Sequence, residues 1–416
     1  MKKKICMASR LIYTLILMVG FAATGFAQTD FWEPVKGPLV GPVTAIVIDR
    51  NDVIFAGTLS GIGRSTDNGD SWSIDLPGIP VGALAINNAG HIFAGTFGQG
   101  VFRSTDHGDT LIAVNNGLTN NFIFALTITS AQHIFAGTFD GGVFRSLDNG
   151  DTWEPVNDGL TETFVAALAI NSAGHLFAAT DSGVFRSVDN GDSWKFSNAG
   201  LPEALVYSLA VNAADHLFAG TGDNGVFRST DNGNSWDDLN IGFDIKTVRT
   251  LVINSAGHLF AGVAGFVGGV FRSLNNGDTW EPINAGWDPA PVLALRFDSQ
   301  NRIWAGTDVG VFRSVGSTTT VDEDPGIMPP SFVLAQNYPN PFNPSTTIAF
   351  DLAQLAPVKL RVFDATGREV AVLADQVFQA GAHKIVFTPN GLANGVYFYR
   401  IEAGGFAQTK KLTLLK

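Results

Sequence analysis

The sequence predicts an all-β protein, a seven-bladed β-propeller with four-stranded blades followed by a small Ig-like β-sandwich. A unit rich in Gly and Phe recurs at intervals of about 42 residues, a length typical of propeller blades. A complete unit holds four short strand-like runs separated by turn residues. The composition agrees with this fold, because Gly at 47 and Phe at 32 combine turn formers with strand formers.

Residues 1–27 have the features of a secretory signal peptide and are set aside. An apolar run at 11–23 is shorter than a membrane span needs, and Gly25-Phe26-Ala27 offers small residues for cleavage. The alternative, an uncleaved anchor, stays open. Four basic residues precede the apolar run: Lys2, Lys3, Lys4 and Arg10.

The mature chain is acidic and lacks cysteine. Cys6, the single cysteine, lies inside the signal peptide, so we expect no disulfide and no thiol chemistry. After cleavage 22 basic residues face 38 acidic ones. Such a surface repels nucleic acid and anionic lipid, so neither is an expected partner. We expect a monomer with no membrane span in the mature chain.

An Arg-Ser pair marks every repeat unit. One complete unit reads as four strands, at 166–171, 175–180, 183–187 and 194–197, the pattern of a propeller blade. The serines of the pairs recur at spacings of 39 to 44 residues: Ser65, Ser104, Ser146, Ser187, Ser229, Ser273 and Ser314.

The two ends of the repeat region predict how the ring closes. The first three strands occur seven times, and the last set ends at Ser314 without a fourth strand. Residues 32–35 (WEPV) match the fourth strands at 153–156 and 280–283. We therefore expect the N-terminal strand to complete the last blade, so that residues 28–314 form a ring without an open edge.

The stretch SLDNGDTW at 146–153 reads as a tight turn between strands three and four. Asp148 can accept backbone hydrogen bonds, Gly150 permits a positive φ, and Trp153 adds apolar surface. This stretch resembles the Ser-x-Asp-x-Gly-x-Thr/Ser-Trp motif of Asp-box propellers, the sialidase-like (BNR) repeat family. The resemblance implies a structural turn on the outside of the blades, at Asp67, Asp106, Asp148, Asp189, Asp231 and Asn275.

Two metal hypotheses are disfavoured, and no cofactor or metal is expected. A calcium loop needs oxygen ligands at alternate positions, but Gly150 and Thr152 follow Asp148 in that order. Equivalent residues of adjacent blades lie too far apart, at about 10 Å, to share one zinc ion. This argument applies to the histidines that open the second strands, which we interpret as packing residues: His91, His133, His175, His216 and His258.

The variable loops are the expected binding face. They connect strands two and three within blades and strand four with the next blade, and they differ between units, whereas the opposite turns are uniform. Variable loops on a rigid scaffold commonly carry binding sites. The alternative, that these are solvated loop residues, stays open. The candidate ligand-binding residues are Asp140, Asp181, Asp223, Asp308 and Trp287.

An enzymatic function is weighed because the Asp-box resemblance includes sialidases and other glycosidases. Outside the repeated pairs the propeller has only Arg50, Arg249, Arg296 and Arg302 as arginines, and Tyr207 is its only tyrosine. Glu162 and Glu203 are its only non-repeated glutamates. We expect no catalytic residue and a non-enzymatic binding or scaffold module for an unknown extracellular glycan or protein. The alternative is an extracellular carbohydrate-active or glycan-binding propeller.

Residues 315–331 read as a polar linker, and residues 332–416 read as the β-sandwich. The sandwich resembles the C-terminal sorting domain of the type IX secretion system (Por family). The resemblance implies export across the outer membrane of a Gram-negative cell by the type IX secretion machinery, to the surface or the medium. Cleavage within the linker stays open. The matching segments are NYPNPFNP (337–344), FDATGR (363–368), GVYFYR (395–400) and Lys410-Lys411.

Overall fold

The computed structural model describes residues 30–35, 37, 41–240, 247–265, 268–286, 290–319, 333–352, 355–378, 381–389, 391–403 and 406–415. Every helix or strand within these ranges is a β-strand, which confirms the all-β prediction. The predicted signal peptide, most of the predicted linker and Trp287 lie outside the described residues.

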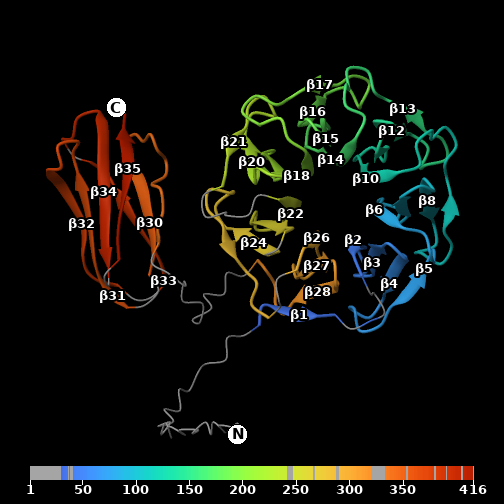
Figure 1. The fold of residues 1–416 in the computed structure, drawn as a ribbon, viewed down its shortest axis with the longest axis horizontal. Coiled ribbons are helices and arrows are strands. Elements are labelled where there is room, and N and C mark those ends of the chain that lie inside the picture. The colour runs from blue at the N-terminus through green and yellow to red at the C-terminus, as the bar shows by residue number, and fades with distance from the viewer. Residues whose placement is uncertain are drawn as a thin grey trace, which may run out of the picture.

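Seven antiparallel sheets of four strands each form the propeller, which confirms the predicted blade number (Figure 1). Blades 1 to 3 consist of β2 (Val43–Ile48), β3 (Ile54–Thr58), β4 (Gly61–Ser65), β5 (Ser73–Asp75); β6 (Val81–Ile86), β7 (Ile92–Thr96), β8 (Val101–Ser104), β9 (Ile112–Ala113); and β10 (Ile123–Ile128), β11 (Ile134–Thr138), β12 (Val143–Ser146), β13 (Glu154–Pro155). Blades 4 and 5 consist of β14 (Val165–Ile170), β15 (Leu176–Thr180), β16 (Val184–Ser187), β17 (Lys195–Phe196); and β18 (Val206–Val211), β19 (Leu217–Thr221), β20 (Val226–Ser229), β21 (Asp237–Asp238). Blades 6 and 7 consist of β22 (Val248–Ile253), β23 (Leu259–Val263), β24 (Gly269–Ser273), β25 (Glu281–Pro282); and β26 (Val292–Phe297), β27 (Ile303–Thr307), β28 (Gly310–Ser314), β1 (Trp32–Pro34).

Strand β1 closes the ring, as the sequence predicts. It pairs antiparallel with β28 and places Trp32 opposite Ser314 and Glu33 opposite Arg313. The Trp32 side chain is 1% exposed, and its Nε1 donates to the Ile283 carbonyl at 2.6 Å. Segments from the two ends of the repeat region therefore form one blade.

The first strand of each blade lines the centre of the ring and contacts the first strands of both neighbouring blades (Figure 1). The second strands lie behind them and are buried along their whole length. Small residues in the second strands make this packing possible. A Cβ atom added to Gly57 would lie 2.8 Å from Cγ1 of Val81, which begins the next blade.

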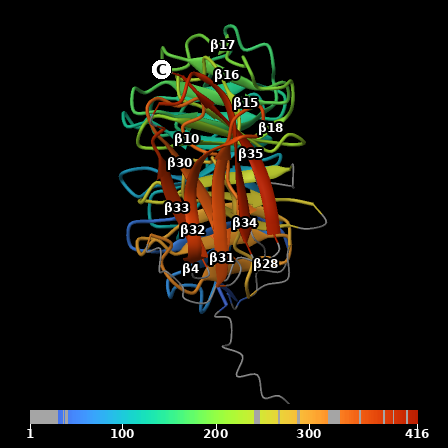
Figure 2. The same cartoon turned by 90° about the vertical axis from the view of Figure 1, so that its left-hand side faces the viewer.

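The C-terminal domain is a sandwich of two antiparallel sheets (Figure 2). One sheet contains β29 (Val333–Leu334), β30 (Thr346–Leu352) and β33 (Gly381–Phe387), in that order. The other follows the order β32 (Glu369–Phe378), β31 (Ala356–Phe363), β34 (Gly395–Ala403) and β35 (Phe406–Leu414). Alternate residues of β31 and β34 are buried, as expected for strands with one face on a core.

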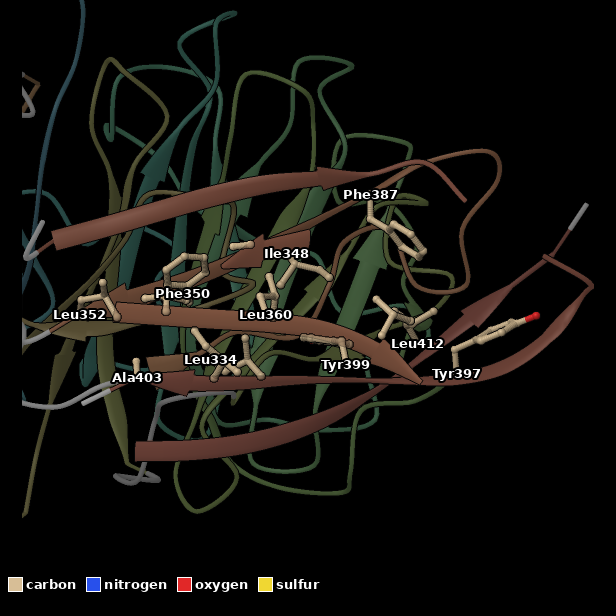
Figure 3. Packing of buried hydrophobic residues seen from close by; sticks show 14 of the residues in the cluster. Leu334, Ile348, Phe350, Leu352, Leu360, Phe387, Tyr397, Tyr399, Ala403 and Leu412 are labelled. Atoms are coloured by element: carbon tan, nitrogen blue, oxygen red, sulfur yellow. The ribbon is translucent and has the colours of Figure 1, made fainter. Parts of the chain in front are cut away.

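Apolar side chains from both sheets fill the space between them (Figure 3). Among them is Tyr399, which is fully buried. Its hydroxyl donates to the Ala335 carbonyl at 2.7 Å and accepts from the Asn337 amide at 2.8 Å. The tyrosine thus holds the start of the NYPNPFNP segment against the core, because these backbone groups have no strand partner there.

Residues 315–319, which the sequence places in the linker, contact the propeller. The Val315 amide donates to the Phe31 carbonyl at 2.9 Å. Thr318 is 2% exposed, donates to the Asn301 carbonyl, and accepts from Asn254 of blade 6. Blade 7 lacks an Asp box, and Thr318 occupies the position where such a box would contact its neighbour.

Candidate functional site

Each Asp box is a self-contained hydrogen-bonded turn. In blade 3, Asp148 Oδ1 accepts from the Ser146 hydroxyl and the Thr152 amide at 2.9 and 2.8 Å. Ser146 Oγ in turn accepts from the Gly150 amide, and Asn149 and Gly150 have φ values of 63° and 91°. The hydrogen bond from the Thr152 hydroxyl is the main cause of the lowered pKa of Asp148. The carboxylate therefore accepts its hydrogen bonds from groups of its own turn.

The repeated arginines connect one blade to the box of the next. Arg145 Nη1 donates to the Asn190 carbonyl and to Asp192 Oδ1, both at 2.7 Å. Equivalent contacts to the next box start from Arg64, Arg103, Arg186, Arg228 and Arg313. A residue that performs the same structural task in six blades is not a ligand-binding group.

The repeated histidines also lie in contacts between blades. His91 Nδ1 is 3.0 Å from Nδ2 of Asn149 in the next Asp box, and His175 makes the same contact with Asn232 at 2.9 Å. Within the described ranges, no group of three His, Cys, Asp or Glu residues has metal-binding geometry. The turn face is thus built mainly from structural contacts.

The four candidate aspartates lie on exposed loops of the opposite face. Asp140, Asp181, Asp223 and Asp308 follow the second strands of blades 3, 4, 5 and 7. No hydrogen bond or ion pair joins any two of them within the part of the chain that the structure describes. The structure therefore distributes these carboxylates around the rim instead of gathering them into one site.

Two of these aspartates have polar neighbours on the connection between blades 3 and 4. Asp140 Oδ1 accepts from the Thr163 hydroxyl at 3.2 Å. Glu162 lies beside Asp181, and its pKa is raised by partial burial, by a hydrogen bond with Asp181 and by the negative charge of Asp181. Asp140, Glu162 and Asp181 therefore form a local acidic rim.

Five phenylalanines converge beside this acidic rim, and the sequence analysis missed them. Phe97 and Phe139 follow the second strands of blades 2 and 3, Phe122 and Phe124 begin blade 3, and Phe164 begins blade 4. We call these five residues the phenylalanine patch. The sequence does contain a signal for this patch, because Phe97 and Phe139 stand at a position where the other blades have no Phe. The residues at that position in the other blades are Leu59, Asp181, Gly222, Ala264 and Asp308.

The patch is a continuous cluster of rings. Phe124 lies at its centre, with ring centroids 4.9 Å from Phe97, 6.0 Å from Phe139 and 5.2 Å from Phe164. The loops that carry the rings are joined by backbone hydrogen bonds, such as Phe139 N to Phe122 O at 3.0 Å. Loop contacts between adjacent blades thus bring together side chains that are separate in sequence.

Part of the patch faces solvent. Phe122 and Phe139 are 49% and 55% exposed, while the other three rings are partly buried beneath them. Large exposed aromatic side chains in contact with one another are characteristic of binding surfaces. A second non-repeated contact lies at blades 5 and 6, where Arg249 Cζ is 4.1 Å from the centroid of the Tyr207 ring.

Comparison with protein families assigns the C-terminal domain. Residues 336–414 match the secretion system C-terminal sorting domain. None of the curated proteins compared with the chain matches it. The part of the chain that the structure describes contains no helix with the length and hydropathy of a membrane span.

Solved structures show the same propeller architecture at low sequence identity. The extracellular domain of the hybrid two component system BT4673 from B. thetaiotaomicron matches with a TM-score of 0.59 and 13% identity, over 78% of this chain and 45% of that chain. PorZ, a surface component of the type-IX secretion system of Porphyromonas gingivalis, matches with a TM-score of 0.53 and 15% identity, over 91% of this chain and 60% of that chain. The GH74 xyloglucanase of Xanthomonas campestris matches with a TM-score of 0.58 and 17% identity, over 70% of this chain and 54% of that chain.

The chain spans less than two thirds of each of these three structures, and the similarity establishes the fold alone. The family match establishes the route of export. Residues 336–414 are a type IX secretion C-terminal sorting domain on a β-propeller chain, and the protein is exported to the cell surface or secreted.

Proposed function

We propose that the protein is a non-enzymatic binding module that holds an extracellular polypeptide through the phenylalanine patch. The exposure of Phe122 and Phe139 on interlocked loops is the observation that carries the proposal. Rings already fixed by neighbouring rings lose little conformational entropy on binding. They can therefore serve as anchors for apolar side chains of a partner.

The acidic rim indicates which charge the partner carries. Asp140 is adjacent to Phe139 in sequence, and Asp181 and Glu162 lie on neighbouring loops. Lys or Arg side chains beside an apolar anchor would complement these carboxylates and steer the encounter. The expected partner is thus a polypeptide segment with apolar and basic residues.

The geometry of the patch favours a polypeptide over a glycan. Ring planes around Phe124 and Phe139 meet at 31° to 86°, so they form no shared flat platform for a sugar ring. Phenylalanine also lacks the polar group with which Tyr or Trp can bond a hydroxyl. Catalysis is not proposed, because the loop-face carboxylates form one exposed pair, Glu162 and Asp181, with no arginine among their hydrogen-bond partners in the described ranges.

The proposal can be tested by comparing the binding of one double variant and one control variant to arrays of peptides and glycans. Phe122→Ser/Phe139→Ser should abolish retention on peptide spots rich in apolar and basic residues, because it removes both exposed anchors. The matched control is Leu147→Ser/Val188→Ser, which removes side chains of similar exposure, 56% and 60%, from two Asp boxes. This control should bind as the unaltered protein does.

Two results would contradict the proposal. Selective retention on glycan spots that depends on the same phenylalanines would favour the carbohydrate-binding alternative. Turnover of a fluorogenic glycosidase or sialidase substrate that disappears in Glu162→Gln would establish catalysis at the acidic rim.

A further inference from the structure

A cavity lies at the turn-face end of the central channel, away from the phenylalanine patch. Its volume is about 450 Å³, within the usual range for small-molecule sites. The first strands of blades 1, 2 and 3 supply apolar walls, which include Val47, Leu84 and Leu126. Arg296 of blade 7 and His107 of the blade 2 Asp box also line it.

The cavity occurs where the contact between blades departs from the repeat. At four junctions a histidine of one blade meets an asparagine of the next box, as His91 meets Asn149. Between blades 1 and 2, Val53 replaces that histidine and His107 replaces that asparagine. The usual pair is therefore missing at this junction, and His107 lines the cavity.

Arg296 is a cation without a counterion. Within the described ranges its side chain forms no hydrogen bond and no ion pair, although water reaches it inside the channel. The side chain is exposed to the channel, yet the protein walls around it lower its pKa by desolvation, and no acidic group offsets this effect. The equivalent residues of the other blades carry no charge: Val47, Ala85, Thr127, Ala169, Ala210 and Val252.

The remaining charged groups of the cavity leave it positive. Arg50 donates to the Asn88 carbonyl at 3.2 Å and lies at the cavity edge. Asp49 is the one lining carboxylate, and its Oδ1 accepts from the Asn51 and Val53 amides at 2.8 and 2.9 Å. Two guanidinium groups thus face one carboxylate that is already hydrogen-bonded.

We propose that this cavity binds a small carboxylate with an apolar body, the carboxylate on Arg296 and the apolar part against the channel walls. A carboxylate can form charge-assisted hydrogen bonds with the guanidinium of Arg296, which has no counterion within the described ranges. Val47, Leu84 and Leu126 belong to the apolar part of the lining, against which an aliphatic or aromatic body would lie. This inference does not depend on the proposed function of the loop face.

Calorimetric titration with matched acids and amides tests the inference. The probes are acetate, 4-methylpentanoate and benzoate, each paired with its neutral amide, added to the purified full chain. We expect saturable binding of at least one of the two larger acids and binding of its amide that is about tenfold weaker or more. Arg296→Gln should weaken acid binding by a similar factor, whereas Arg249→Gln, which alters the cation stacked on Tyr207, should not.

Thermal unfolding separates a binding role from a structural one. Without ligand, Arg296→Leu should unfold at the same temperature as the unaltered protein or higher, because it removes an uncompensated cation. A clearly lower unfolding temperature would show that Arg296 stabilises the fold and would overturn the assignment. Equal affinity for acid and amide, unchanged affinity in Arg296→Gln, or no saturable binding of any acid would overturn it as well.

Discussion

Hydrogen bonds to ionised carboxylates stabilise the Asp-box turns. The pKa values of Asp106 and Asp189 fall from 3.8 to about 2, chiefly because neighbouring Thr110 and Ser193 hydroxyls donate to them. A carboxyl group with a lower pKa in the folded state stabilises the fold above its unfolded pKa. This stabilisation is lost as the pH falls through the folded value.

Acid unfolding is the corresponding prediction at the residue scale. The unfolding temperature should decrease steeply between pH 4 and pH 2, because the boxes must take up protons there. Asp189→Asn should fold and show a smaller decrease, since Asn275 already forms the same turn without a charge. Asp308→Asn, on an exposed loop, is the control, and an equal change of slope in both variants would contradict this explanation.

At the scale of the element, the pairing of β1 with β28 completes blade 7 and closes the ring. Its Trp32 packs beside Ile283 and Val292, and its Glu33 pairs with Arg313 of β28. These contacts join residues separated by more than half of the chain. Closure therefore depends on few residues, of which Trp32 buries the most surface.

Trp32→Ala should lower the free energy of unfolding by about 3–5 kcal/mol, since it removes a large buried ring and leaves the Ile283 carbonyl without that donor. Urea titration of the purified protein measures the change. The control is Ile112→Ala in the edge strand β9, where a 53% exposed side chain should contribute less than about 0.5 kcal/mol. Equal effects of the two substitutions would refute closure through β1.

The elements were largely predictable from the sequence, because each blade repeats the same residue types at the same spacing. The repeat of IFAGT-like second strands and the unpaired WEPV segment were sufficient for blade number and closure. The phenylalanine patch was not predictable in this way. Its members lie in several loops and in strand β10, and they converge because the loop after a second strand meets the connection to the next blade.

At the scale of the whole molecule, the two faces of the propeller have different compositions. The turn face consists mainly of Asp boxes and the arginine and histidine contacts that join blades. The loop face carries the phenylalanine patch and the acidic rim. The sorting domain directs export of the propeller to the cell surface or medium.

Photo-crosslinking on the exported protein tests most directly whether the loop face binds. Benzoyl-phenylalanine would replace Phe139 in one variant and Leu147 of the turn face in another, two positions with nearly equal exposure of 55% and 56%. Irradiation of cells and medium should yield a discrete polypeptide adduct from position 139 and none from position 147. Adducts from position 147 alone, equal adducts from both, or none from position 139 would contradict the account.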